Sequence, residues 1–229
     1  MNKQYSILLL DADDTIFDFH AAERIAFFAM MEQMGISADD EMHAIYSSIN
    51  ERHWKALERG ELTREQVLVG RYACFAEHFG LQKDPEEMNR CYLQNLSLQT
   101  ILFEDSMEAM RELAKHYRIY IVTNGNAMVQ RGRFAKSPVM EFVDDYFISG
   151  EIGYEKPDVR YFEAVFSKIP EFDREKALLA GDSATSDLQG AINAGLDSCY
   201  VDRRSKPLSD GISPTYRVSN LMELARLLS

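Results

Sequence analysis

Short apolar runs alternate along much of the chain with segments in which apolar residues follow a helical period. The runs are too short for helices and read as strands buried on both faces, at residues 5–10, 119–122, 146–149, 177–180 and 198–201. Helical periods separate them, near residues 106–116, 159–169, 188–194 and 221–228. This alternation predicts an α/β fold with a parallel sheet flanked by helices.

Residues 21–98 break the alternation, because every signal in this stretch is helical. Ser37 is expected to cap the second of four helices, and Thr63 with Gln66 forms a capping box for the third. Asp84, followed by proline and two glutamates, opens the fourth. We therefore expect a four-helix unit within the chain.

The first strand and the later strands belong to one sheet, so the helical unit is an insertion. We expect an α/β core made of residues 1–15 and 99–229. Residues 16–98 are then an all-helical inserted domain, which we call the cap.

Charge and composition narrow the classes of partner. The 229 residues contain 25 Lys and Arg against 37 Asp and Glu, a net charge of −12, which disfavours binding to nucleic acid or to an anionic membrane. No apolar stretch reaches the ~18–20 residues of a membrane span. No secretory signal is visible, and the three cysteines make neither a disulfide framework nor a metal motif, so we expect a cytoplasmic protein.

Acidic and hydroxyl side chains follow several predicted strands, where ligands bind in open α/β sheets. These strand-end residues are Asp11, Asp13, Asp14 and Thr15 after the first strand, Thr123 and Asn124 after the second, Lys156 after the third, and Asp182 and Asp187 after the fourth. Such a group of carboxylates needs a cation among them, and ligands that are all oxygen indicate Mg²⁺.

The same residues resemble the four motifs of the haloacid dehalogenase (HAD) superfamily. Asp11-x-Asp13-x-Thr15, the strand ending at Thr123, Lys156-Pro157 and Gly181-Asp182-x4-Asp187 occur in the family's order. The helical insertion after the first motif is similar to the family's C1-type cap, which implies a Rossmann-like core. Within the family, the runs IVTNG, GYEKP and GDSATSD resemble the bacterial YjjG/YfnB-type pyrimidine 5′-nucleotidases.

Chemistry and resemblance together assign roles. Asp11 is the expected nucleophile and Asp13 the acid and base, while Thr123, Asn124 and Lys156 are expected to bind the phosphoryl oxygens. The resemblance implies that Mg²⁺ is held by Asp11, by the main-chain carbonyl of Asp13 and by Asp182. Asp187 is expected to hold metal-bound water or Lys156, and Thr15 to brace the turn that aims Asp13.

Three aromatic residues are candidates for stacking on a substrate base: Phe17, Phe19 and Trp54. A place in the core or at the cap interface fits each of them equally well.

We predict a Mg²⁺-dependent phosphomonoesterase acting through an aspartyl-phosphate on a small phosphorylated metabolite. The resemblance implies that the substrate is a pyrimidine nucleoside 5′-monophosphate. Alternatives within the superfamily are a phosphosugar phosphatase, a phosphomutase or a metal-free dehalogenase, and outside enzymes a phospho-receiver signalling domain. The sequence leaves monomer and homodimer open.

Overall fold

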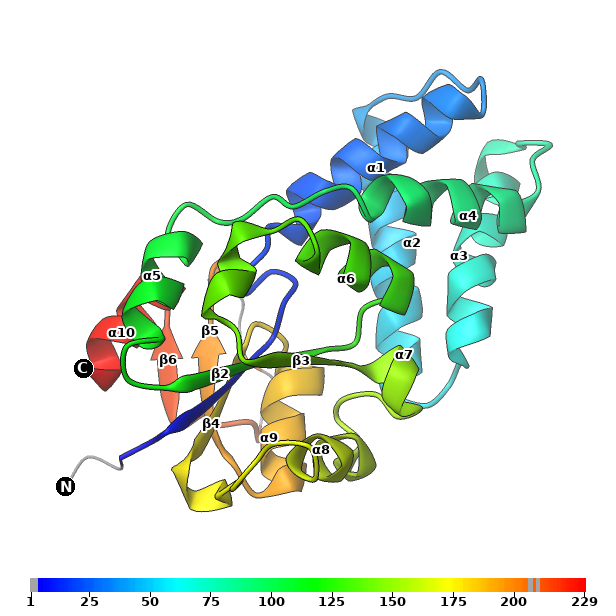
Figure 1. The fold of residues 1–229 in the computed structure, drawn as a ribbon. Coiled ribbons are helices and arrows are strands. Elements are labelled where there is room, and N and C mark those ends of the chain that lie inside the picture. Colours follow the sequence, from blue (N-terminus) through cyan, green and yellow to red (C-terminus); the bar gives the residue numbers. More distant parts are fainter. Residues whose placement is uncertain (1–3, 206–207, 209–210) are drawn as a thin grey trace. The chain divides into compact units, whose positions relative to one another are not determined.

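The structure is a computed structural model that describes residues 4–205, 208 and 211–229 (Figure 1). Its internal contacts divide the chain into a first unit, Met1–Phe19 with Thr100–Ser229, and a second unit, His20–Gln99. The division differs from the expected boundaries at residues 16–19 and at Gln99. Ile16 and Phe17 are fully buried in the hydrophobic core of the first unit, which explains why this short segment belongs there.

A six-stranded sheet forms the centre of the first unit, in the order β3-β2-β1-β4-β5-β6, with each neighbouring pair parallel. The strands are β1 (Ile7–Leu10), β2 (Arg118–Thr123), β3 (Asp145–Ile148), β4 (Ala177–Gly181), β5 (Asp197–Val201) and β6 (Tyr216–Val218). The predicted α/β fold with a parallel sheet is confirmed. The sequence analysis missed β6, which is only three residues long and carries an exposed arginine at its centre.

Alternate side chains of β1 point into two separate hydrophobic clusters, one on each face of the sheet. Leu8 and Leu10 pack on the face covered by α5 (Ser106–Leu113) and α10 (Leu221–Leu228). Ile7 and Leu9 pack on the face covered by α8 (Val159–Phe166) and α9 (Gln189–Ala194). Figure 1 shows these two helix pairs on opposite sides of the strands. Burial on both faces accounts for the continuous apolar sequence of β1.

Shorter elements connect the strands of the first unit. They are α6 (Ala127–Phe134), η1 (Pro138–Phe142), α7 (Ser149–Ile152), η2 (Arg174–Lys176) and the π-helical turn η3 (Ala184–Leu188). Both α6 and η3 begin directly beyond the carboxyl end of a strand. They therefore carry side chains to the edge of the sheet where the sequence predicts a site.

The second unit consists of four helices, α1 (Phe19–Gln33), α2 (Asp40–Glu58), α3 (Arg64–Phe79) and α4 (Pro85–Leu96). The capping box of Thr63 and Gln66 and the cap at Asp84 are confirmed. The prediction that Ser37 caps α2 is wrong. The cap is Asp39, whose carboxylate accepts a hydrogen bond from the Met42 amide, and a carboxylate also interacts favourably with the helix dipole.

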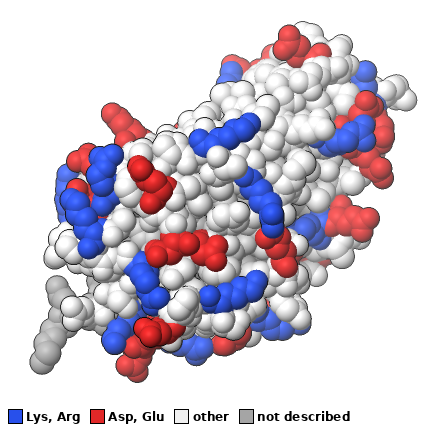
Figure 2. Space-filling view, in the orientation of Figure 1, with Lys and Arg blue, Asp and Glu red and all other residues white. Residues whose placement is uncertain are grey.

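On the face drawn in Figure 2, side chains of both charges are mixed. Figure 2 shows basic and acidic side chains interspersed on the face that it draws, without a continuous basic patch. Among the described residues, no helix combines the length and the apolar character that crossing a membrane requires.

Two helical glycines provide a direct test of the packing. A Cβ at Gly190 of α9 would lie 2.7 Å from the ring of Phe162, whereas a Cβ at Gly70 of α3 would meet His53 at an ordinary 3.5 Å. We predict that Gly190→Ala lowers the free energy of unfolding by about 1–3 kcal/mol through overpacking. Gly70→Ala, the matched control, should leave it unchanged or raise it by up to about 1 kcal/mol. Urea unfolding measures both, and equal effects would contradict the described packing of α8 on α9.

Candidate active site

The carboxyl ends of β1 and β4 lie side by side at the centre of the sheet. Leu10 is in register with Ala180, and the next residue, Asp11, donates its main-chain N–H to the Ala180 carbonyl at 2.9 Å. From β1 the sheet extends through β2 on one side and through β4 on the other, which is the switch point where open α/β sheets bind ligands. Asp11 and Asp182 are the first residues after β1 and β4, so both lie at this switch point.

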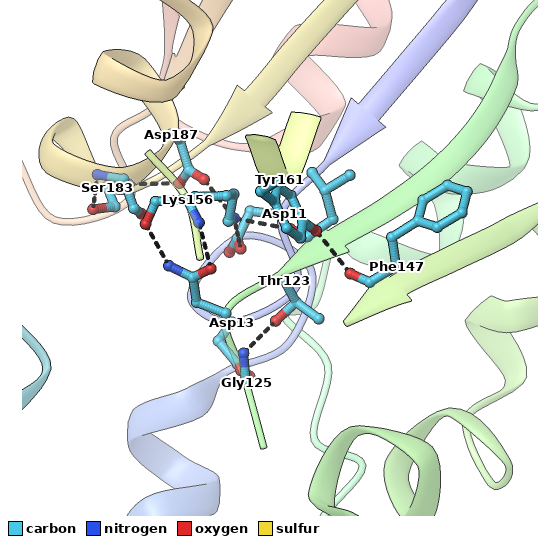
Figure 3. Close-up of polar contacts among 12 residues, drawn as sticks. Asp11, Asp13, Thr123, Gly125, Phe147, Lys156, Tyr161, Ser183 and Asp187 are labelled. Carbon is cyan, nitrogen blue, oxygen red and sulfur yellow. Dashed lines mark hydrogen bonds and ion pairs between the residues drawn. The ribbon is translucent and has the colours of Figure 1, made fainter. Parts of the chain in front are cut away.

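Lys156 lies between two carboxylates at this point (Figure 3). Its ammonium Nζ is 2.7 Å from Asp11 Oδ1, 2.6 Å from Asp187 Oδ1 and 2.8 Å from the main-chain carbonyl oxygen of Val122. An ammonium has three N–H donors, so these three acceptors use all of them. The Lys156 side chain is 1% exposed, and the three contacts fix it in place.

Burial and charge act in opposite directions on these groups. Burial raises the pKa of Asp11 to about 7, although the Lys156 ammonium opposes the rise. Burial alone would lower the pKa of Lys156, but the carboxylates of Asp11 and Asp187 outweigh it and raise the pKa above its ordinary value. Lys156 is therefore a permanent cation at the site.

Asp187 reaches the cluster from the π-helical turn η3 and is fully buried. Its Oδ1 accepts from Lys156, and its Oδ2 accepts from the main-chain N–H of Ser183 at 3.0 Å. A Cβ at Gly181 would lie only 2.2 Å from Asp187 Oδ2, so the end of β4 must be glycine for this carboxylate to fit. Both oxygens of Asp187 are thus engaged by the protein itself.

The acidic side chains at the site suit a divalent metal ion. Asp11, Asp182 and Asp187 each place a carboxylate oxygen within 4.8 Å of the other two. All three donors are hard oxygen ligands, which suit Mg²⁺. Asp11 and Asp182 fit the predicted ligand set, and the contacts of Asp187 with Lys156 and Ser183 suit the supporting role that we expected for it.

Thr123 and Asn124 occupy the end of β2 in different ways. The Thr123 hydroxyl oxygen accepts from the Gly125 amide and from the Gln130 side-chain amide, both at 3.0 Å. The Asn124 side chain instead pairs with the main chain of Lys156, donating to its carbonyl at 2.8 Å and accepting from its amide at 2.9 Å. The Asn124 side chain therefore holds the lysine loop.

Asp13 belongs to the same site through partners that the sequence analysis did not identify. Its two carboxylate oxygens contact Arg133 Nη1 at 2.5 Å and Gln130 Nε2 at 2.8 Å. Arg133 and Gln130 lie three residues apart on α6, and both are fully buried. The available signal was two polar residues at helical spacing, five and eight positions after Gly125. Such spacing alone does not show which way the two side chains face.

The turn after β1 is braced differently from the prediction. The Thr15 hydroxyl is buried, and it has no hydrogen-bond partner within the described part of the chain, so it does not brace the turn by a hydrogen bond. The Thr15 main-chain carbonyl instead accepts two bonds from the Arg203 guanidinium, at 2.8 and 3.1 Å, and Arg203 also binds Asp105. No local pattern links Arg203 to Thr15, because 188 residues separate them.

The three aromatic candidates for base contacts have different surroundings. Phe17 is fully buried beneath the Arg133 guanidinium, with 4.5 Å between the guanidinium carbon and the ring centre, so it is a core residue and cannot stack on a base. Phe19 begins α1 and is half-buried. Trp54 is half-buried in the second unit, where its indole N–H donates to Asn50. Phe19 and Trp54 remain candidates.

Comparisons with known proteins agree with this geometry. A family model described as haloacid dehalogenase-like hydrolase matches residues 5–195. Pyrimidine 5′-nucleotidase PynA of Streptococcus pneumoniae is 30% identical over 96% of this chain and 93% of its own length. Pyrimidine 5′-nucleotidase YjjG of Escherichia coli is 28% identical over 96% of both chains.

A solved structure extends the likeness to three dimensions. The HAD-hydrolase YfnB of Bacillus subtilis is 36% identical, and its crystal structure bound to magnesium superposes with a TM-score of 0.95. That match covers 99% of this chain and 100% of the other. The family model matches most of this chain, and one relative is more than 30% identical over nearly all of it. The chain therefore belongs to the haloacid dehalogenase-like hydrolases.

Proposed function

We propose that the protein is a Mg²⁺-dependent phosphatase that hydrolyses pyrimidine nucleoside 5′-monophosphates. The observation that carries the phosphatase proposal is the buried Asp11 carboxylate at the switch point, 2.7 Å from the Lys156 ammonium and beside Asp182 and Asp187. The pyrimidine nucleotide is proposed from the relatives PynA and YjjG. Membership of a hydrolase family disfavours the signalling-domain alternative.

Asp11 is the nucleophile in this proposal. Its carboxylate oxygen bonds to phosphorus while the bond from phosphorus to the 5′-oxygen breaks, giving an aspartyl-phosphate and a nucleoside. Lys156 stabilises the charge on the phosphoryl oxygens, and the Thr123 hydroxyl donates to one of them. The residues that would hold Mg²⁺ are Asp11, Asp182 and the Asp13 carbonyl, and the bound cation would offset the repulsion between phosphate and carboxylate.

Asp13 moves the protons in both halves of the reaction. It gives a proton to the departing 5′-oxygen, so that the nucleoside leaves as an alcohol. In the second half it takes a proton from the water that attacks phosphorus. That step releases inorganic phosphate and restores the Asp11 carboxylate.

The nucleophile is tested by Asp11→Asn. We predict that this change lowers kcat at least about 1,000-fold, because an amide cannot attack phosphorus. The fold should survive, since Lys156 keeps Asp187 and Val122 as partners. Asp40→Asn, at an exposed carboxylate of the second unit, is the matched control. Phosphate release and circular dichroism measure activity and fold, and a variant with near-normal kcat would remove Asp11 from this role.

The metal site is tested by chelation and by one ligand variant. EDTA should stop phosphate release and added Mg²⁺ should restore it. Asp182→Asn should raise the Mg²⁺ concentration for half-maximal rate at least about 10-fold. Removing a metal ligand should weaken Mg²⁺ binding at least as much as removing a residue that only supports a ligand. Asp202→Asn is the control, because Asp202 and Asp182 line one small hollow but the Asp202 carboxylate pairs with Arg217. Full activity in EDTA would contradict the proposed cofactor.

The substrate class is tested by a panel of phosphorylated metabolites assayed with Mg²⁺. We predict that kcat/KM is highest for UMP, dUMP and dTMP, lower for purine nucleotides and lowest for sugar phosphates. A preference for sugar phosphates would replace the nucleotidase proposal and leave the phosphatase proposal standing. Activity that requires a bisphosphate primer, with phosphate retained on the product, would identify a phosphomutase.

A further inference from the structure

Two buried residues of α6, Gln130 and Arg133, contact the functional groups of the site from one side. Both are 0% exposed. Arg133 Nη1 lies 2.5 Å from Asp13 Oδ1, and Gln130 Nε2 lies 2.8 Å from Asp13 Oδ2. Each oxygen of the proposed acid and base therefore has its own donor, which fixes the rotation of the carboxylate as well as its position.

The orientation of the Gln130 amide follows from its neighbours. Its Oε1 accepts from Arg133 Nη1 at 3.1 Å, so its NH₂ group must face Asp13 and Thr123. The opposite orientation would bring the amide oxygen against the Asp13 carboxylate and the amide protons against a guanidinium. Arg133 therefore fixes Gln130, in addition to its own contact with Asp13.

The Gln130 NH₂ group has two protons, and they bind two different parts of the site. One goes to Asp13 and the other to the Thr123 hydroxyl oxygen at 3.0 Å. That hydroxyl also accepts from the Gly125 amide, so both of its lone pairs are occupied. Its own proton then points away from these donors and is available to a substrate oxygen.

Gly125 is required for this arrangement. A Cβ at position 125 would lie 2.3 Å from Gln130 Nε2 and 2.7 Å from two of its carbons. Glycine at position 125 thus leaves the space that the Gln130 side chain occupies.

The buried Arg133 charge is more easily explained by its contact with Asp13 than by a contribution to the stability of the fold. A guanidinium removed from water is costly, and its ion pair with a carboxylate returns little net stability. Here the carboxylate partner is a residue at the site whose side chain is 26% exposed, and the guanidinium also lies over the buried Phe17 ring.

We propose that Gln130 and Arg133 are positioning residues for the phosphatase reaction. They hold the Asp13 carboxylate toward the leaving group and turn the Thr123 hydroxyl into a donor for the phosphoryl group. Both residues act through Asp13 and Thr123 rather than on the phosphate ester itself. This inference rests on the proposed function, because it assigns Asp13 the proton transfer to the leaving oxygen.

The proposal predicts an effect that depends on the leaving group. The 5′-oxygen of UMP needs a proton in order to leave, whereas nitrophenolate leaves p-nitrophenyl phosphate without one. The value of kcat/KM reports the steps through the first bond cleavage for both substrates. A residue that acts through Asp13 should therefore matter for UMP and much less for p-nitrophenyl phosphate, whereas a merely structural residue would affect both equally.

The test uses Arg133→Lys in the full chain with Mg²⁺. We expect kcat/KM for UMP to fall about 100-fold. The value for p-nitrophenyl phosphate should fall less than about 3-fold, because Gln130 keeps its own bonds to Asp13 and Thr123 and so still orients the Thr123 hydroxyl. Arg131→Lys is the matched control, because Arg131 is on the same helix but 63% exposed and paired with Glu151, and it should change neither value. Equal losses for the two substrates, or no loss for UMP, would overturn the proposal.

A second variant keeps the test decisive if Arg133→Lys does not fold. Gln130→Ala leaves the guanidinium in place and removes the donors to Asp13 and Thr123. It should lower kcat/KM for both substrates through Thr123, with a further loss of at least about 10-fold for UMP through Asp13. A uniform loss would contradict the positioning of Asp13. A wild-type protein that hydrolyses neither ester would instead contradict the proposed function itself.

Discussion

The three contacts of the Lys156 ammonium are the constraint on which the site depends. They join Asp11 after β1, the Val122 carbonyl near the end of β2, and Asp187 on the turn after β4. Two buried carboxylates this close together repel each other strongly, and the Lys156 ammonium between them offsets that repulsion. Neighbouring residues support these contacts: Gly181 leaves room for the Asp187 carboxylate, and the Asn124 side chain holds the main chain of Lys156.

The charge balance around Lys156 also explains what the site attracts. Three carboxylates, those of Asp11, Asp182 and Asp187, face one ammonium, so the site favours a further cation. With a divalent ion present the balance is close to neutral, and a phosphate anion can approach in spite of the acidic surface of the whole chain. A single lysine therefore permits the acidic cluster, and in the proposed reaction its positive charge also offsets the charge of the phosphoryl group.

Much of this could be predicted from the sequence, because strands buried on both faces are visible as apolar runs and their ends carry the polar residues. Asp11, Lys156, Asp182 and Asp187 were placed at strand ends in this way, and parallel pairing brings those ends together. Contacts made by helix faces and distant loops could not be predicted. The contact of Arg133 with Asp13 depends on how α6 rotates onto the sheet, and that of Arg203 with Thr15 joins residues at nearly opposite ends of the chain. Neither contact can be predicted from the local pattern of apolar and polar residues.

The central claim is that Asp11 becomes covalently bonded to phosphorus beside a Mg²⁺ ion held by Asp182. Beryllium trifluoride bonds to a carboxylate oxygen as a stable mimic of a phosphoryl group, so a crystal structure with Mg²⁺ and this reagent tests the claim most directly. We predict that the trifluoride is attached to an oxygen of Asp11 and that Asp182 ligates the metal. A trifluoride attached to another side chain, or a metal bound without Asp182, would contradict the account.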